Sequence, residues 1–563
     1  METTWQDVLA FDQLAWVLSA CIVLSYVVAS IWNEENCSLV HPLILAHQAR
    51  FSPTRKQGET PTITSSGATT HLLPTTPDRS VKSLLHLLLK AEGRLQQIDI
   101  NSIVVSSAPH PLNVSCFIID DFICPLSFLY QTQNIAFNTL VANVRNNLWS
   151  LLASTKTEDG NENHPRLLIL CADPYLRLVL SLAAATLPIM TILATPKRSG
   201  TLPVEIQLAL EPHIVHLCLV VSELPADMTK EVLGSKLATR CQIMPSHRLS
   251  AWFQSGNTET VAPDDLSELS KARLRIVSYS SRPDGQQTNK ARVFEFTPEN
   301  LLAGVTGSLG LFPLAGKLNA KDTIALELGG DEIWGSASSM AVAGLYSGAS
   351  VYFFNGFKLL SECKPTVLLL KSMTAQILAE EVVQLSKLSL LKKLAIGRRL
   401  SKVFNGALGS PLPETTEWVG PHLRAMLTDD PITQSTATLI RAGFGVSLQR
   451  VYVHPVGAGP LLASQQYDFQ LTRPHRPTTS TTVHCGPPGA NVECKIVAVP
   501  EPALINHDAW KGKLLVRGPS VGSELTPDGD AAEAEDFHAV ADVAQVLPNG
   551  TFQVFSRSLS GDD

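Results

Sequence analysis

The residues that could perform chemistry are dispersed along this chain, and their spacing fits few known mechanisms. Asp429 and Asp430 are adjacent carboxylates that could suggest a metal site, but we interpret them as a solvated turn. The segment GLFPLAGK (310–317) approaches the phosphate-binding pattern G-x-x-x-x-G-K-[ST]. It has one intervening residue too many, and Leu318 stands where a Ser or Thr would bind magnesium, so we reject it.

Other catalytic and metal-binding patterns are missing from the sequence. Ten cysteines are scattered, and no two of them form a C-x-x-C pair. Because tetrahedral zinc sites need close pairs of ligands, we expect no metal site and mostly reduced cysteines in the core. There is no H-E-x-x-H, no G-x-S-x-G and no G-x-G-x-x-G after a predicted strand. We therefore expect no zinc, serine hydrolase or dinucleotide mechanism, and we assign no catalytic residue.

The composition is that of a folded and rather apolar protein. Hydrophobic residues make up 45% of the 563 residues and charged residues 17%, which excludes a disordered scaffold. The formal net charge is −7, so no basic field favours a nucleic acid partner. Only one window is long and uncharged enough to span a bilayer, which excludes a multi-pass transporter.

That window is residues 13–32 (QLAWVLSACIVLSYVVASIW), and it predicts a single N-terminal transmembrane helix. Twenty residues at 1.5 Å each match a hydrocarbon core of about 30 Å. A cleaved signal peptide fits less well, because the preceding residues are acidic and contain no Lys or Arg. The nearest basic residues, Arg50, Arg55 and Lys56, follow the segment and favour a cytosolic body. Endoplasmic reticulum, lipid droplet and peroxisomal membranes all remain open.

The elements that must position any site follow a strand–helix–strand pattern from about residue 100. We predict a strand at 167–171, a helix at 176–186 and a strand at 189–193, which are typical of parallel βαβ units. A second such series runs over 276–453, and short strands separated by turns follow residue 492. The predicted fold is therefore α/β, with two βαβ lobes of mostly parallel sheets, a small antiparallel β lobe and the N-terminal transmembrane helix. The predicted boundaries are 1–35 for the membrane anchor, 36–100 for a linker or arm, 101–270 for the first lobe, 271–475 for the second lobe and 476–563 for the β lobe.

Several motifs occur in an order that resembles one family. CGPPGANVECKIVAVPE (485–501) is similar to VGxPLPxxEIKLVDVPE, and KGKLLVRGPSV (511–521) is similar to GELLVRGPxVF. FHAVADVAQVLPNGTFQVFSR (537–557) resembles FRTGDIGxxDPDGTLxIIDR. These patterns belong to the adenylate-forming (AMP-binding) superfamily, and within it the chain most resembles the long-chain acyl-CoA synthetases.

The resemblance implies a two-step reaction. A carboxylate attacks ATP to give an acyl-adenylate, and coenzyme A then displaces AMP. Such an enzyme needs a flexible loop around the phosphates, a carboxylate for Mg²⁺, an Asp for the ribose, and a lysine on a C-terminal lid. ATP and Mg²⁺ are the cofactors implied if the family's activity persists, and a fatty acyl group is the ligand implied.

The phosphate loop of the family, YTSGTTGxPKG, aligns with the segment that begins at Tyr279. Tyr279, Ser281 and Gly285 match it. Pro283 removes a backbone N–H donor, and Asp284 places a negative charge beside a triphosphate. The lysine of the family aligns with either Lys290 or Arg292, and Thr297 and Asn300 match a downstream element of the family, TH-x-N.

The adenine motif of the family, GYGxTE, aligns with 451–456. Tyr452 matches and could stack on adenine, but Val456 stands where the family's Mg²⁺-binding Glu belongs and offers no oxygen. Asp542 matches the ribose aspartate and Arg557 the arginine of the IIDR element. Residues 279, 281, 285, 452, 542 and 557 are thus the vestigial nucleotide-binding set.

The chain ends at Asp563, six residues after Arg557, where the resemblance would place the start of the lid. We therefore expect the lid and its lysine to be missing. These substitutions predict a membrane-anchored acyl-CoA synthetase-like pseudoenzyme that binds a lipid or a protein partner. The alternatives are an active fatty acid–CoA ligase with divergent motifs and a structural component of a membrane complex.

Overall fold

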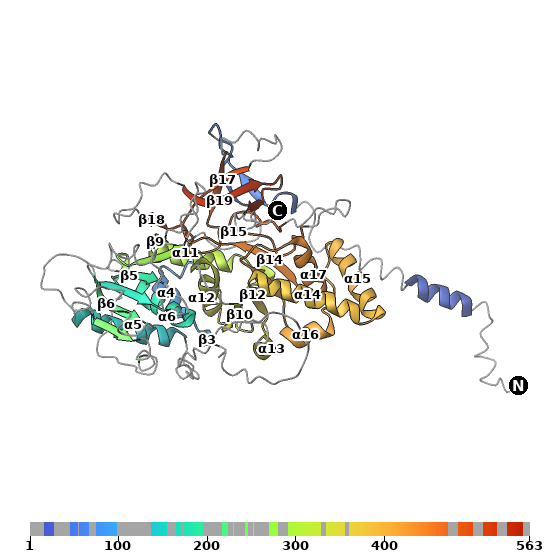
Figure 1. Ribbon diagram of the computed structural model, residues 1–563, viewed down its shortest axis with the longest axis horizontal. Helices are drawn as coiled ribbons and strands as arrows, with labels where there is room; N and C mark the ends of the chain where they lie inside the picture. Colours follow the sequence, from blue (N-terminus) through green and yellow to red (C-terminus); the bar gives the residue numbers. More distant parts are fainter. Residues whose placement is uncertain are drawn as a thin grey trace.

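The computed structural model of the chain has three β-sheets with helices around two of them (Figure 1). It describes residues 16–26, 45–54, 56–66, 75–97, 137–154, 165–171, 173–194, 217–222, 229, 242–245, 252, 269–279, 291–327, 334–354, 360–470, 482–498, 511–525 and 537–555.

The first sheet has seven strands, of which the central ones are parallel. Its order is β18 (Ser523–Leu525), β9 (Ala291–Phe296), β8 (Arg273–Tyr279), β5 (Met190–Ala194), β4 (Arg166–Leu170), β6 (Leu217–Ser222) and β7 (Gln242–Pro245). From β8 to β7 the pairs are parallel, while β9 and β18 are antiparallel. β4 is apolar and buried along four of its five residues, as expected for a parallel strand that is covered on both faces.

The second sheet also has seven strands, and all but one of its pairs are parallel. Its order is β15 (Leu462–Ala463), β14 (Ser447–Tyr452), β13 (Ala425–Thr428), β12 (Val367–Leu370), β10 (Thr323–Glu327), β11 (Ser350–Phe354) and β3 (Arg94–Gln97). Only β15 runs antiparallel to its neighbour. The carboxyl ends of β10, β12, β13 and β14 therefore lie along one edge of the sheet.

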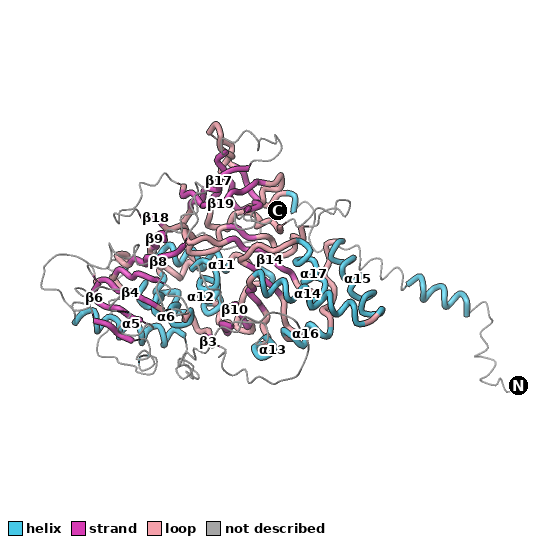
Figure 2. Tube along the Cα trace, viewed as in Figure 1, coloured by secondary structure: helices cyan, strands magenta, loops and turns pink. Residues whose placement is uncertain are grey.

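Helices cover these two sheets and fill the space between them. Besides the helical residues 16–26, the helices of the body are α4 (Leu84–Lys90), α5 (Phe137–Ser154), α6 (Pro174–Ala185), α11 (Pro298–Leu309), η4 (Leu314–Gly316), η5 (Trp334–Ser338), α12 (Ser339–Tyr346), α13 (Leu360–Cys363), α14 (Ser372–Leu388), α15 (Leu390–Phe404), α16 (Pro413–Val419) and α17 (Gln434–Phe444). Figure 2 shows α14, α15 and α17 grouped beside the second sheet. α6 is buried on nearly every residue, which is typical of a helix packed on all sides.

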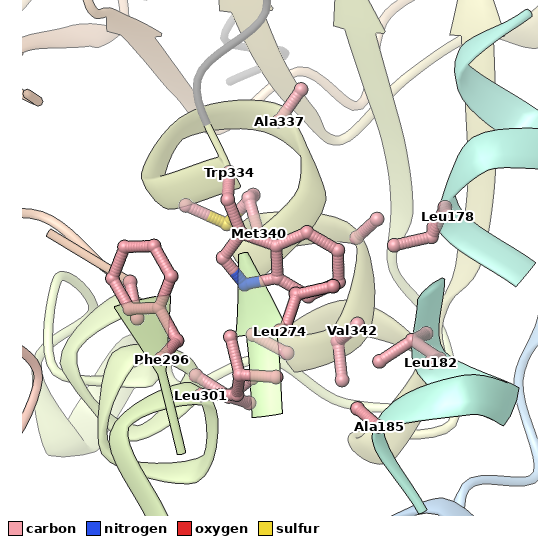
Figure 3. Packing of buried hydrophobic residues seen from close by; sticks show 14 of the residues in the cluster. Leu178, Leu182, Ala185, Leu274, Phe296, Leu301, Trp334, Ala337, Met340 and Val342 are labelled. Atoms are coloured by element: carbon pink, nitrogen blue, oxygen red, sulfur yellow. The ribbon is translucent and has the colours of Figure 1, made fainter. Parts of the chain in front are cut away.

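The two lobes share one hydrophobic core. Trp334 is 4% exposed and belongs to this core together with residues from both sheets. Figure 3 shows its neighbours, which come from α6, β8, β9, α11 and α12: Leu178, Leu182, Ala185, Leu274, Phe296, Leu301, Met340 and Val342.

The third sheet is antiparallel and lies above the junction of the other two in Figure 1. Its order is β1 (Ala49–Phe51), β2 (Ile63–Ser65), β16 (Glu493–Ala498), β17 (Lys511–Arg517), β19 (His538–Val546) and β20 (Phe552–Phe555). The predicted arm contributes to two sheets, because β2 pairs with β16 and β1 pairs with β2, while β3 pairs with β11. The prediction of two βαβ lobes and an antiparallel β lobe thus agrees with the three sheets.

The predicted transmembrane helix at 13–32 is wrong. Of this segment the structure describes residues 16–26, which are helical. A helix that spans a hydrocarbon core of about 30 Å needs about twenty apolar residues at 1.5 Å each. Within the described ranges, no helix is both long enough and apolar enough to cross a membrane.

Candidate functional site

Polar side chains gather where β10, β12 and β13 end. Glu327 is the last residue of β10, Lys371 follows β12, and Asp429 and Asp430 follow β13. Nζ of Lys371 lies 2.7 Å from Oδ2 of Asp429, and the hydroxyl of Ser336 donates to the same oxygen. Open α/β sheets usually bind ligands outside the carboxyl ends of their strands, so this edge is the first place to look for a site.

Asp429 is not part of a solvated turn, and that interpretation of the sequence is wrong for this residue. Its side chain is 3% exposed, while that of Lys371 is 20% exposed. Its second oxygen, Oδ1, is buried and has no hydrogen-bond partner among the described residues. An unpaired carboxylate at this depth would be costly, so the ammonium of Lys371 is what allows Asp429 to be buried.

The other two carboxylates bind the beginning of α14. Glu327 accepts a hydrogen bond of 2.7 Å from the backbone N–H of Lys371 and another from the hydroxyl of Thr374. Asp430 accepts one of 2.9 Å from the backbone N–H of Ser372. Lys371 is the N-cap residue of α14 and makes no side-chain cap, so these carboxylates satisfy the free N–H groups of the helix. Burial raises the pKa of Glu327, although these hydrogen bonds oppose the shift.

The predicted adenine motif lies where the second sheet meets the first and third sheets. Tyr452 ends β14 and is 7% exposed, and Val456 is 3% exposed. The backbone O of Val456 accepts from the N–H of Gly522 at 2.8 Å, and the N–H of Ala458 donates to the O of Ser520 at 2.8 Å. The segment that should supply the Mg²⁺ ligand is therefore a buried apolar connection between lobes.

His454 in this motif is a neutral packing residue. Its ring contacts Phe294 of β9 edge-on, with the centroids 6.1 Å apart. Its Nδ1 accepts a hydrogen bond of 3.2 Å from the N–H of Val456 and so carries no proton. Burial, and then the positive charge of Arg292, lowers the pKa of His454 to about 3. A histidine in this state gives no general base with a pKa near neutrality.

Arg292, one of the two candidates for the phosphate-loop lysine, is engaged in another contact. Its guanidinium forms an ion pair with Glu524 of β18 through two hydrogen bonds. It also lies over the ring of Phe294, 5.2 Å from the centroid. The other candidate, Lys290, lies outside the described residues.

The structure places half of the predicted nucleotide-binding set. Tyr279 ends β8, Tyr452 ends β14, and Asp542 lies in β19. Near Asp542 the register shifts, so that residues 540–542 face Leu514 alone, and such bulges often occur beside binding sites. Ser281, Gly285 and Arg557 lie outside the described residues.

Thr297 and Asn300 form a helix cap. The hydroxyl of Thr297 accepts from the N–H of Asn300 at 3.2 Å, and the side-chain oxygen of Asn300 accepts from the N–H of Thr297 at 2.9 Å. The side-chain amide of Asn300 also donates to the backbone O of Pro519 and of Val521, at 2.8 and 3.2 Å. The residues that match the family's TH-x-N element thus form a capping box. Its asparagine also links α11 by hydrogen bonds to the segment between β17 and β18.

A cavity of about 90 Å³ lies beside the C-terminal end of α11. The loops at 460–467 and 487–490, together with Gln449 and Ser65, form its wall. None of the lining side chains is charged, so this wall offers no Lys or Arg to pair with a triphosphate.

Lys371, Ser336 and Glu327 were not predicted as site residues from the sequence. A signal was available, because LLLK, AMLTDD and IALE each place a polar residue at the end of a buried apolar run. Parallel strands align such ends on one edge. Ser336 gives no comparable signal, because it lies in the irregular helix η5.

The comparisons with known proteins identify the fold. The N-terminal domain of FACL13 from Mycobacterium tuberculosis is 10% identical, with a TM-score of 0.55 over 84% of this chain and 100% of that one. An adenylation domain of a keto acid-selecting NRPS module, bound to keto acyl adenylate, is 11% identical, with a TM-score of 0.55 over 86% and 81%. O-succinylbenzoate coenzyme A synthetase (MenE) from Bacillus subtilis, in complex with AMP, is 13% identical, with a TM-score of 0.52 over 85% and 79%.

No protein-family model matches the chain, and no curated protein matches it. At these identities the structural likeness shows the fold alone. The resemblance to the adenylate-forming superfamily that was inferred from the motifs is confirmed for the fold.

Proposed function

We propose that this chain, which has the fold of the adenylate-forming enzymes, does not catalyse adenylation and serves as a binding protein instead. The observation that carries the proposal is Val456. It occupies the position of the expected Mg²⁺-binding Glu, it is 3% exposed, and its backbone pairs with Gly522. Mg²⁺ needs oxygen ligands in addition to phosphate, and a buried valine provides none.

Neighbouring groups offer no substitute for the missing carboxylate. Glu524 is paired with Arg292, and Nδ1 of His454 is already an acceptor for a backbone N–H. Among the described residues, no group of three or more His, Cys, Asp or Glu could hold a metal ion. In the sequence, Pro283 and Asp284 further weaken the predicted phosphate loop.

The ion pair at the strand ends supports the same proposal. Lys371 and Asp429 neutralise each other within the protein, and Ser336 donates to the same carboxylate. A ligand at this edge would have to compete with an internal salt bridge for either charge. Among the described residues, the polar side chains at the carboxyl ends of β10, β12 and β13 are thus paired within the protein, apart from Oδ1 of Asp429.

The test is acyl-adenylate formation by the purified full chain. We expect no exchange of pyrophosphate into ATP, and no acyl-AMP, with Mg²⁺ and fatty acids of several chain lengths. Activity that is lost in Asp542→Ala but kept in Glu493→Ala would overturn the proposal. Glu493 is a matched control, because it lies on the same sheet and its side chain is 38% exposed.

What the fold binds in place of substrates is a second part of the proposal. The chain could bind a fatty acyl ligand or a protein partner without catalysing a reaction. Native mass spectrometry of the full chain from two expression hosts separates them. A fatty acid that copurifies at a fixed stoichiometry supports the ligand, and its absence from both hosts rules it out.

A further inference from the structure

We propose that the corner between α14 and α15 is a docking surface for an anionic lipid membrane. Four leucines project from this corner, and we call them the leucine corner: Leu388, Leu390, Leu391 and Leu394. These residues are 67%, 79%, 80% and 71% exposed. Isolated exposed leucines are ordinary, but four within seven residues form a patch that calls for a function.

The leucine corner is not the packing face of α15. Ile396 and Val403 occupy that face and are 4% and 0% exposed. The exposed leucines of α15 therefore lie at the start of the helix, away from its buried residues. Only Ser389 separates α14 from α15, so the leucines lie at a sharp turn at the edge of the second lobe (Figure 1).

The charge around the leucine corner is strongly positive. Six Lys and Arg residues lie between 387 and 402, and no Asp or Glu occurs from 382 to 413. The whole chain carries a net charge of −7, so this cluster contrasts with the rest of the molecule. Some of these cations are engaged, since Lys392 pairs with Glu414 at 2.6 Å. Lys387 and Lys393 are exposed and directly precede leucines of the corner.

This combination fits a lipid surface better than a protein partner. Cores of protein interfaces are enriched in aromatic residues and depleted in Lys, whereas this patch consists of Leu and Lys. A basic amphipathic helix buries its apolar residues at the level of the headgroups, and its lysines reach the anionic phosphates. The helix is a surface element, so shallow insertion needs no rearrangement of the core.

The test places a fluorescent reporter at the leucine corner of the full chain. Leu391→Trp is mixed with vesicles of phosphatidylcholine and phosphatidylserine at about 7:3, with brominated acyl chains as quencher. Emission of the added tryptophan is obtained as the difference from wild type, which has eight tryptophans. We expect a blue shift and a loss of that emission. Because the reporter is local, other segments of the chain that bind the vesicle do not affect the result.

Leu314→Trp is the matched control, because Leu314 is 60% exposed on η4, outside the basic cluster. Its added emission should stay unquenched. The double substitution Lys387→Glu and Lys393→Glu in the Leu391→Trp background should restore emission. The proposal is overturned if the Leu391→Trp emission is unaffected, which would leave a protein partner for this surface. It is also overturned if pure phosphatidylcholine vesicles quench equally.

Discussion

At the scale of single residues, the polar groups at the carboxyl ends of β10, β12 and β13 satisfy one another. Lys371 neutralises Asp429, while Glu327 and Asp430 accept hydrogen bonds from the start of α14. Each contact joins residues that are more than forty positions apart in the chain. The edge of the sheet is therefore held by long-range pairs, and these pairs can be tested one at a time.

Asp429→Ala should destabilise the protein by on the order of 2 kcal/mol, because it leaves the partly buried ammonium of Lys371 without a counter-charge. Removing one partner of a fully buried pair costs about 3–5 kcal/mol, and partial exposure of Lys371 reduces this. Urea unfolding measures the change. Adding Lys371→Met should recover most of the loss. Glu493→Ala is the control, because Glu493 forms an exposed ion pair with Arg517. If Asp429→Ala lowers the free energy of unfolding no more than Glu493→Ala does, the pair of Lys371 with Asp429 is unimportant for stability.

His454 gives a pH dependence with a definite sign. In the unfolded chain it titrates near 6.5, and in the fold its pKa is about 3. The unfolded state therefore binds more protons between these values, and the free energy of unfolding falls as the pH drops from about 6.5 toward 3. The slope from this residue reaches at most about 1.4 kcal/mol per pH unit.

His454→Asn isolates this contribution. The asparagine oxygen can accept the N–H two residues on, at Val456, but it does not titrate. We expect unfolding curves of the variant between pH 7 and pH 4 to lose stability less steeply than those of wild type. Equal slopes in the two proteins would mean that His454 is protonated in the folded state.

At the scale of elements, α11 is fixed between the sheets by its N-terminal cap and by a close approach at Gly304. A Cβ at Gly304 would lie 2.1 Å from the backbone O of Ala458, and one at Gly459 would lie 2.5 Å from the O of Gly304. The helix therefore touches the segment that follows the predicted adenine motif, backbone against backbone. This contact holds the motif in its buried position.

Gly304→Ala should be strongly destabilising, whereas Gly397→Ala should be stabilising. The first substitution forces α11 away from Ala458, at a cost of about 2 kcal/mol or more. Gly397 lies within α15 with nothing within 4 Å of a Cβ, so alanine should add about 0.5–1 kcal/mol through helix propensity. Thermal unfolding of both variants gives the comparison. A stabilising Gly304→Ala would show that this contact is absent.

Elements with a strong local pattern were predictable from the sequence. The strand expected at 167–171 is β4 at Arg166–Leu170, and the helix expected at 176–186 is α6 at Pro174–Ala185. Both have continuous apolar runs, and Asp173 caps α6 through the N–H groups of Tyr175 and Leu176. In contrast, β1 and β2 have three residues each and acquire their structure by pairing, β1 with β2 and β2 with β16. Three residues carry no readable period.

The candidate site was predictable only in part, for the same reason. The motif order located Tyr452 and Asp542 because these lie in segments whose local sequence resembles the family. The pairing of Lys371 with Asp429 depends on two strand ends being neighbours, which a linear pattern does not encode. The spanning helix was predicted from hydropathy, which reports apolar character and not the length of a helix, and no helix within the described ranges is long and apolar enough to cross a membrane.

At the scale of the whole molecule, the N-terminal arm connects the second lobe to the third sheet. The side chain of Gln48 is buried and donates to Oδ2 of Asp468 at 2.6 Å, while its backbone N–H donates to the O of Asn549 at 3.0 Å. Asp468 also lies 3.2 Å from Nε2 of His484. The carboxylate of Asp468 thus binds a side chain that is more than four hundred positions away in the chain.

Gln48→Ala should lower the free energy of unfolding by about 1–3 kcal/mol, because it removes a hydrogen bond from a buried carboxylate. Hydrogen exchange should show the effect at the seam between β2 and β16, where the N–H of Ile496 donates to the hydroxyl of Thr60 at 2.9 Å. The strands of the first sheet should keep their protection. Unchanged exchange along β16 would mean that the arm pairs independently of Gln48.

The central claim, that this chain neither binds ATP with Mg²⁺ nor forms an adenylate, is tested most directly by calorimetric titration of the full chain with ATP and Mg²⁺. Buried Val456 and the paired groups around it predict no saturable heat up to millimolar nucleotide. Saturable, Mg²⁺-dependent binding that disappears in Asp542→Ala would contradict the claim.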